Sequence, residues 1–122
     1  MNWICVFIGG GLGSVFRFGL STVMMKFAGV FPWSTLVSNV VASIIIGLIA
    51  ALFDKNTTGL IWPFLVVGFC GGLSTFSTFS LETFHLFKSG YHFLGWLNIL
   101  LSTALTLATV FLIMKWMGNP DH

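Results

Sequence analysis

Long apolar stretches alternate with short polar ones along this chain. Four stretches are almost continuously apolar, at residues 3–25, 35–53, 60–87 and 93–117. An α-helix needs about 20 apolar residues to cross the hydrocarbon core of a bilayer, and each stretch is close to that length or longer. The polar stretches between them are too short to form a domain of their own. The pattern therefore predicts an all-α membrane protein in which residues 1–122 form one domain of four transmembrane helices.

The composition agrees with a membrane protein. Hydrophobic residues make up 57% of the 122 residues and charged residues only 7%, whereas about a quarter of the residues of a soluble domain are charged. Lys and Arg number five and Asp and Glu three, so we expect no basic surface that would bind nucleic acid. The N-terminus lacks the basic start and the cleavage site of a signal peptide, so we expect the first stretch to remain as a span.

Side-chain patterns that carry catalysis are missing from the sequence. Cys5 and Cys70 lie in apolar surroundings at a spacing that metal sites do not use, which favours buried thiols. Glu82 and His85 form a Glu-x-x-His pair like those of di-iron bundles, but such sites need further carboxylates, and the other acids lie outside the spans. No serine inside a span has histidine and acid partners at a recognisable spacing. We therefore predict that the protein is not an enzyme.

The third apolar stretch contains an unusual segment, residues 71–80 (GGLSTFSTFS). Its two adjacent glycines predict a broken helix near Gly71–Thr75, because glycine adds backbone freedom and no packing side chain. A broken, hydroxyl-rich helix is tolerated at membrane depth only against protein or a water-filled cavity. We therefore interpret this segment as the lining of a transport path. Its hydroxyl residues are Ser74, Thr75, Ser77, Thr78 and Ser80.

Helical spacing groups several residues of this third helix. Thr75, Thr78 and Glu82 share one face, and Phe76 and Phe79 lie on a neighbouring face. Aromatic residues at this spacing usually form core, but the positive edge of a phenyl ring can also meet an anion. Glu82 is the only acid expected at membrane depth, and such acids are candidates for function.

The other helices add further polar candidates. Ser102 and Thr106 begin a hydroxyl stripe on the fourth helix, although hydroxyls can also bond back to their own helix. Asn39 either joins helices or donates to a passing anion, and its spacing alone favours the first. Arg17 either reaches the headgroups or faces the bundle or a vestibule, where its charge would concentrate anions.

Glycines also recur on the first helix, at residues 9–14 (GGGLGS). The run superficially resembles a dinucleotide-binding loop, but it has no strand–helix–strand context and no acidic residue follows about 20 positions later. Gly9 and Gly13 instead form a small-xxx-small pair, which favours close helix packing.

Basic residues around the spans show no clear bias toward one membrane face. Lys55 and Lys115 are expected on one side, while Lys26 and Lys88 are expected on the other with Arg17 deeper in that half. Because an excess of Lys and Arg normally marks the cytoplasmic side, this balance predicts insertion in both orientations and an antiparallel dimer. The alternative is one orientation, set by a feature that the charges do not reveal.

The polar residues suggest what such a path would carry. Hydroxyls, amides and ring edges are neutral donors, which suit an anion that must bind weakly at several sites and then leave. A broken helix also frees backbone carbonyls, which can coordinate a hard cation such as Na⁺. If two antiparallel breaks met at a dimer axis, their carbonyls would form a small oxygen cage.

Three segments together resemble the Fluc (CrcB-type) fluoride channels. Residues 71–80 resemble the signature of that family, and residues 9–17 (GGGLGSVFR) and 35–39 (TLVSN) are similar to its first- and second-helix motifs. The likeness covers essentially the whole chain. It implies a passive channel that exports fluoride across the cell (inner) membrane, built as an antiparallel dual-topology homodimer with a structural Na⁺ at the dimer interface.

The resemblance also implies roles for particular residues. Ser74 stands where the family usually has threonine, but a backbone ligand survives that change. The implied roles are pore phenylalanines for Phe76 and Phe79, a pore amide for Asn39, Na⁺-binding carbonyls for Gly71 and Ser74, a polar track at Ser102 and Thr106 with Glu82 near it, and a vestibule position for Arg17.

Two other functions remain open at this point. A small multidrug-resistance-type antiporter also has four helices and dual topology, but it needs a proton-coupling acid, usually on the first helix. Glu82 would have to serve here, because the first helix has no acid. The second alternative is a non-transporting subunit of a larger helical assembly.

Overall fold

The structure is a computed structural model that describes residues 1–27, 29–54, 56 and 59–118. Its regular elements are all helical within this part of the chain. They are α1 (Asn2–Met24), the 3₁₀ segment η1 (Met25–Phe27), α2 (Trp33–Leu52), the π-helical segment η2 (Trp62–Cys70), α3 (Gly71–Leu73), α4 (Phe76–Lys88) and α5 (His92–Met117). Lys55, one of the basic residues used above to weigh orientation, lies outside the described residues.

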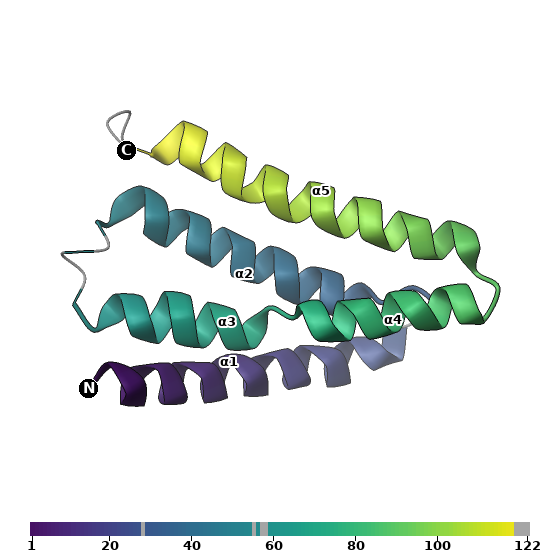
Figure 1. The fold of residues 1–122 in the computed structure, drawn as a ribbon, viewed down its shortest axis with the longest axis horizontal. Helices are drawn as coiled ribbons and strands as arrows, with labels where there is room; N and C mark the ends of the chain where they lie inside the picture. The colour runs from purple at the N-terminus through teal and green to yellow at the C-terminus, as the bar shows by residue number, and fades with distance from the viewer. Residues whose placement is uncertain (28, 55, 57–58, 119–122) are drawn as a thin grey trace.

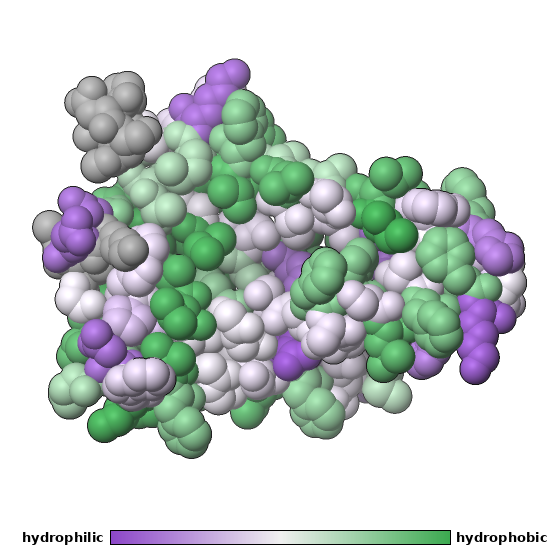
Figure 2. Space-filling model, viewed as in Figure 1, coloured by the Kyte–Doolittle hydropathy of each residue, from purple (hydrophilic) through white to green (hydrophobic). Residues whose placement is uncertain are grey.

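Four helical stretches are long and apolar enough to cross a membrane. Their boundaries are close to the predicted ones: Asn2–Phe27, Trp33–Leu52, Trp62–Lys88 and His92–Met117. Large apolar side chains point outward along them, where a bilayer would contact them; Phe7, for example, is 82% exposed. Figure 2 shows hydrophobic residues over much of one face, interrupted by weakly polar and hydrophilic ones in a hollow near the middle of the molecule.

Successive spans run in opposite directions (Figure 1). The start of α1 and the end of α5 therefore lie at the same end of the molecule, and the turns before α2 and before α5 lie at the other end. α1 packs mainly on η2 and α3, whereas α2 and α4 pack on α5. The third span thus changes neighbours along its length, from α1 before the α3–α4 junction to α5 after it.

Glycines allow α1 to approach η2 and α3 at backbone distance. A side chain on Gly9 or Gly13 would collide with backbone atoms of η2, and one on Gly72 would collide with the carbonyl of Gly10. The predicted packing role of Gly9 and Gly13 is confirmed. Gly72 has the same role, because only a residue without a side chain fits between the two backbones.

The backbone leaves helical geometry at Ser74 and Thr75, between α3 and α4. Both residues are extended, with φ −78° and ψ 156° at Ser74 and φ −153° and ψ 124° at Thr75. Gly71 is helical (φ −64°, ψ −36°) and Gly72 lies within α3, so the predicted reason for the interruption, glycine flexibility, was wrong.

The side-chain amide of Asn39 stabilises the extended residues instead. Its Oδ1 accepts from the Thr75 N–H at 2.7 Å, and its Nδ2 donates to the Thr75 carbonyl at 3.2 Å. The amide thereby pairs the Thr75 N–H, which no longer bonds to Gly71, and adds a partner to the Thr75 carbonyl, which as the N-cap of α4 also accepts the first bond of that helix.

Candidate functional site

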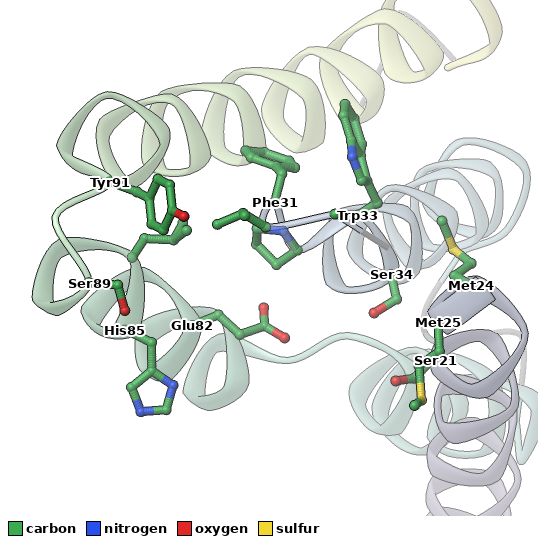
Figure 3. A pocket seen from close by; sticks show the side chains of 14 residues that line it. Ser21, Met24, Met25, Phe31, Trp33, Ser34, Glu82, His85, Ser89 and Tyr91 are labelled. Carbon is green, nitrogen blue, oxygen red and sulfur yellow. The ribbon is translucent and has the colours of Figure 1, made fainter. Parts of the chain in front are cut away.

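A pocket of about 340 Å³ opens between η1, the start of α2 and the end of α4 (Figure 3). We call it the mouth pocket. The Glu82 carboxyl group points across it toward Ser34 and Ser21, away from Tyr91 and His85 (Figure 3). The mouth pocket therefore combines apolar walls with one acid and several hydroxyls near one end of the spans. Its polar lining residues are Ser21, Ser34, Glu82, His85, Ser89 and Tyr91.

A second cavity, the middle pocket, lies next to the mouth pocket. It measures about 180 Å³ and shares Ser21, Ser34 and Glu82 with the mouth pocket. Phe18 is its only apolar lining residue among the described ones. A pocket with such a lining inside an apolar bundle favours water or an ion over lipid. The other residues that line it are Ser14, Arg17, Thr35, Ser38, Thr75 and Thr78.

A third cavity, the inner groove, measures about 360 Å³ and begins where the middle pocket ends, because Thr75 lines both. Residues of α2, α4 and α5 and of the extended segment before α4 form its walls. The three cavities thus follow one another, with Glu82 at the first junction and Thr75 at the second. The groove is lined by Asn39, Ser43, Ser74, Thr75, Phe76, Phe79, Ser102, Thr103, Thr106 and Leu107.

The structure divides the residues predicted for the pathway between these cavities. The inner groove brings together Asn39, Ser74, Thr75, Phe76, Phe79, Ser102 and Thr106. The middle pocket brings together Arg17, Thr75, Thr78 and Glu82. Ser77 and Gly71 line none of the three cavities. The Ser77 hydroxyl lies 3.4 Å from that of Thr75, and Gly71 is exposed.

Two polar atoms at the middle pocket are buried without a hydrogen-bond partner among the described residues. They are Ser38 Oγ and Glu82 Oε2. The other carboxyl oxygen, Glu82 Oε1, accepts from the Thr35 hydroxyl at 2.8 Å. Leaving a buried polar group unpaired costs about 1–3 kcal/mol. Such groups usually indicate a bound water or ion, so both atoms point to an occupant of the middle pocket.

Arg17 faces the bundle in this structure. Its Nε donates to the Gly72 carbonyl at 3.1 Å, and the residue is half-buried. This contact connects α1 to the third span just before the extended segment. Because Nε is used, the terminal guanidinium nitrogens are the donors that remain for the middle pocket. Arg17 thus places a positive charge in the same cavity as Glu82.

Asn39 joins helices, which is the first of the two roles considered for it. Both of its polar atoms bond to Thr75, but Nδ2 carries a second N–H beyond the one donated to the carbonyl. Thr75 in turn caps α4, because its Oγ1 accepts from the Thr78 N–H at 3.2 Å. The amide therefore fixes the extended segment and keeps one donor in reserve beside the inner groove.

Hydroxyls along the inner groove donate to carbonyls one turn earlier on their own helices. Ser43 bonds to the Asn39 carbonyl, Ser74 to that of Cys70 and Thr106 to that of Ser102, at 2.7–2.8 Å. These carbonyls lie within or next to helices, so their bonds to hydroxyls are additional to the helical ones. A hydroxyl can therefore turn toward a passing anion and back at a cost of about one ordinary hydrogen bond, 0.5–1.5 kcal/mol.

The two phenylalanines lie together at the outer side of the groove. Their ring centroids are 5.6 Å apart with an interplanar angle of 39°. Phe76 is 78% exposed on the protomer, whereas Phe79 is half-buried. The groove wall at Phe76 is therefore open on this side.

Two backbone carbonyls at the junction have lost their helical donors. In an α-helix Gly71 would accept from Thr75 and Ser74 from Thr78. The Thr75 N–H bonds to Asn39 instead, and the Thr78 N–H bonds to the Thr75 hydroxyl. Both carbonyls are thus released as oxygen ligands, which fits the donor type that Na⁺ prefers. No group of three or more His, Cys, Asp or Glu residues that could hold a metal occurs among the described residues.

Two residues with clear roles were not predicted from the sequence. Thr35 orients the Glu82 carboxyl group. Asn98 is 1% exposed on α5 and bonds to Thr83 and Ser102. An amide within an apolar stretch was the signal that identified Asn39, and the same signal could have identified Asn98.

The fold and the three cavities define a class of protein: small four-span membrane proteins with a polar, interrupted route between their helices. The family of CrcB-like proteins, described as Camphor Resistance (CrcB), matches residues 4–114. The chain therefore belongs to this family.

Several relatives are similar over almost their whole length. A protein of Coxiella burnetii (strain CbuK_Q154) is 40% identical over 116 residues, which are 92% of this chain and 94% of the relative. One of Pyrococcus abyssi is 42% identical over 111 residues, 89% of each chain. One of Serratia proteamaculans is 40% identical over 121 residues, 95% of each chain. All three are named "Fluoride-specific ion channel FluC".

Proposed function

We propose that this protein is a passive fluoride channel, which lets fluoride leave the cell down its gradient and so reduces fluoride toxicity in the cytoplasm. The family and the names of the relatives support a channel of the membrane rather than an enzyme. Within the chain, the proposal is carried by the succession of polar cavities from the mouth pocket to the inner groove. We assign the protein to the cell (inner) membrane, with the lipid bilayer around its four spans.

In this proposal fluoride loses part of its water shell in the middle pocket. The positive charge of Arg17 attracts the anion, and the unpaired hydroxyl of Ser38 donates to it. The Glu82 carboxyl group, oriented by Thr35, opposes tight binding by its negative charge. Attraction and repulsion in one small pocket give a weak site, and conduction requires sites that the ion can leave.

From there the ion passes the Thr75 junction into the inner groove. The second N–H of Asn39, the ring edges of Phe76 and Phe79 and the rotating hydroxyls offer successive weak donors. We assign these hydroxyls to Thr75, Ser102 and Thr106 in the groove, with Thr78 in the middle pocket and Ser77 beside Thr75 as further donors of the path. A small anion is favoured because these donors can close around it.

We further propose that the working unit is an antiparallel dual-topology homodimer. The Phe76 ring and the Gly71 backbone are exposed on the protomer, so a second copy would cover them. The Gly71 and Ser74 carbonyls give only two oxygen ligands per chain, and a second chain would complete a Na⁺ site. When bound there, Na⁺ would join the two breaks by neutralising the facing carbonyl dipoles.

A proton-coupled antiporter that uses Glu82 is not favoured. The relatives carry the name of a channel. In this chain Glu82 shares its pocket with Arg17, whose charge would repel an organic cation substrate.

Charge movement distinguishes the two functions. Purified protein would be reconstituted into liposomes that contain potassium fluoride, and external fluoride would be followed with an electrode. Fluoride that leaves through a passive channel creates a membrane potential that soon stops further efflux. Valinomycin lets potassium leave as well and removes this potential, so adding it should start rapid efflux. An exchange that runs on a proton gradient and ignores valinomycin would contradict the channel.

A further inference from the structure

The interface between α4 and α5 contains a buried amide that lines none of the three cavities. Asn98 on α5 is 1% exposed. Its Nδ2 donates to the Thr83 hydroxyl of α4 at 2.9 Å, and its Oδ1 accepts from the Ser102 hydroxyl at 3.2 Å. Thr83 and Ser102 are themselves 7% and 6% exposed. Both polar atoms of the amide are therefore bonded to neighbours inside the bundle.

These bonds join two residues of the inner groove through two residues outside it. Thr83 Oγ1 donates to the Phe79 carbonyl at 2.7 Å. Phe79 and Ser102 both line the groove, whereas Thr83 and Asn98 do not. The chain of bonds thus runs from the Ser102 hydroxyl through Asn98 and Thr83 to the backbone of Phe79.

The number of available hydrogens fixes which atom donates and which accepts in each bond of this network. A threonine hydroxyl has a single hydrogen, and Thr83 uses it for the Phe79 carbonyl. Thr83 can then only accept from Asn98, which requires the NH₂ group of the amide to face Thr83 and its oxygen to face Ser102. The Ser102 hydrogen is consequently directed to Asn98 and not to its own helix, unlike the hydrogen of Thr106.

We propose that Asn98 is a positioning residue for the ion path: it holds the Ser102 hydroxyl in the groove that Phe79 also lines, and it sets how readily that hydroxyl turns to an anion. This inference rests on the proposed fluoride conduction. Asn98 itself does not touch the ion. Because the Asn98–Ser102 bond is the longest in the network, it is the bond that an anion would displace most easily.

Asn98→Leu is the direct test because leucine has nearly the shape of asparagine and removes both bonds. If Asn98 acts through Ser102, Asn98→Leu and Ser102→Ala each lower the initial fluoride efflux about tenfold, the factor that corresponds to one lost hydrogen bond near the upper end of its range. The double variant then shows the efflux of Ser102→Ala alone, because the second change removes nothing further.

The matched control is Thr109→Ala, which removes an exposed α5 hydroxyl bonded to the Leu105 carbonyl. It should leave efflux unchanged by itself and in the Asn98→Leu background. Effects of Asn98→Leu and Ser102→Ala that multiply would overturn the inference, since a merely structural Asn98 acts independently of Ser102. Ser102→Ala with wild-type efflux would overturn it as well.

A second variant covers the case in which Asn98→Leu fails to fold. Thr83→Val cuts the same chain of bonds from the α4 side at nearly constant volume, and it should be equally non-additive with Ser102→Ala. Efflux from the wild-type protein distinguishes a failure of the proposed fluoride conduction from a failure of the proposed role of Asn98. Efflux no faster than from empty vesicles would reject fluoride conduction and this inference with it, whereas rapid wild-type efflux with multiplying effects would reject only the role of Asn98.

Discussion

At the scale of single residues, the middle pocket depends on polar atoms that the protomer leaves unpaired. Ser38 Oγ and Glu82 Oε2 are both buried without a partner among the described residues, while Thr35 occupies the other carboxyl oxygen. An unpaired buried hydroxyl does not stabilise the folded protein, which is explained if an ion or a water molecule bonds to it. Stability and conduction should therefore respond to Ser38 in opposite directions.

Ser38→Ala should raise the free energy of unfolding by about 1 kcal/mol and lower fluoride efflux about threefold to tenfold. The first effect follows because the buried polar atom is removed, and the second because the ion loses a donor. Denaturation in detergent and electrode traces from liposomes would measure the two. Ser80→Ala is the control, since Ser80 is exposed and bonds to the Phe76 carbonyl. Unchanged efflux in Ser38→Ala would remove this donor from the path.

Phe79→Ile should abolish fluoride efflux while the dimer still forms. Isoleucine keeps an apolar side chain but lacks the positive ring edge that we propose as a donor to the anion in the inner groove. Phe84→Ile is the matched control, because Phe84 lies on the same helix, is 57% exposed and lines none of the three cavities. Efflux from vesicles and the mass of the detergent-solubilised protein would be measured together. Normal efflux from Phe79→Ile would exclude a role for the ring edge.

At the scale of elements, the two halves of the third span pack against different helices. η2 and α3 pack on α1, and α4 packs on α5. Ser74 and Thr75 make this change possible, and Asn39 of α2 stabilises them by bonding to both the N–H and the carbonyl of Thr75. The extended segment is therefore held by a side chain of another helix as well as by the hydroxyl of Thr75, which caps α4.

Asn39→Leu should destabilise the protein by about 1–3 kcal/mol, because it leaves the half-buried N–H of Thr75 without its partner. Asn39→Asp keeps the acceptor for the N–H and should cost less. Unfolding of both variants in detergent would give the two differences in free energy. A leucine variant as stable as the wild type would show that the amide does not hold the extended segment.

The sequence was enough to predict the four spans, but it did not reveal which contacts stabilise the extended residues between α3 and α4. Apolar length alone predicts a membrane helix, so the four span boundaries were close to the observed ones. Glycine flexibility failed as the cause because Gly71 and Gly72 are helical, and the residue responsible, Asn39, lies 36 positions from Thr75 in the chain. The role of Thr35 was missed for a related reason, because its contact with Glu82 joins residues that lie 47 positions apart in the chain.

At the scale of the whole molecule, the single chain leaves an aromatic ring and two backbone carbonyls uncovered at the junction. The Phe76 ring is exposed at the inner groove, and two released carbonyls lie at the junction. Successive spans alternate in direction, so among the described basic residues Lys26 and Lys88 lie toward one end of the bundle and Lys115 lies toward the other. A copy inserted in the opposite orientation would bring a second junction to the first.

A tag on the C-terminus should be found on both faces of the membrane in comparable amounts. The reason is that Lys and Arg do not favour one end of the bundle strongly enough to fix its orientation. Labelling of the tag in intact and in permeabilised cells would measure the two populations. A tag on one face only would refute dual insertion, and with it the antiparallel dimer.

The central claim is that a polar route between these helices passes fluoride. Vesicles loaded with equal fluoride and chloride test it most directly, with both external ions followed by electrodes after valinomycin is added. The account predicts rapid release of fluoride and chloride release no faster than from protein-free vesicles, because the weak donors must close around a small ion. Fluoride release at the protein-free rate, or equal release of both ions, would contradict it.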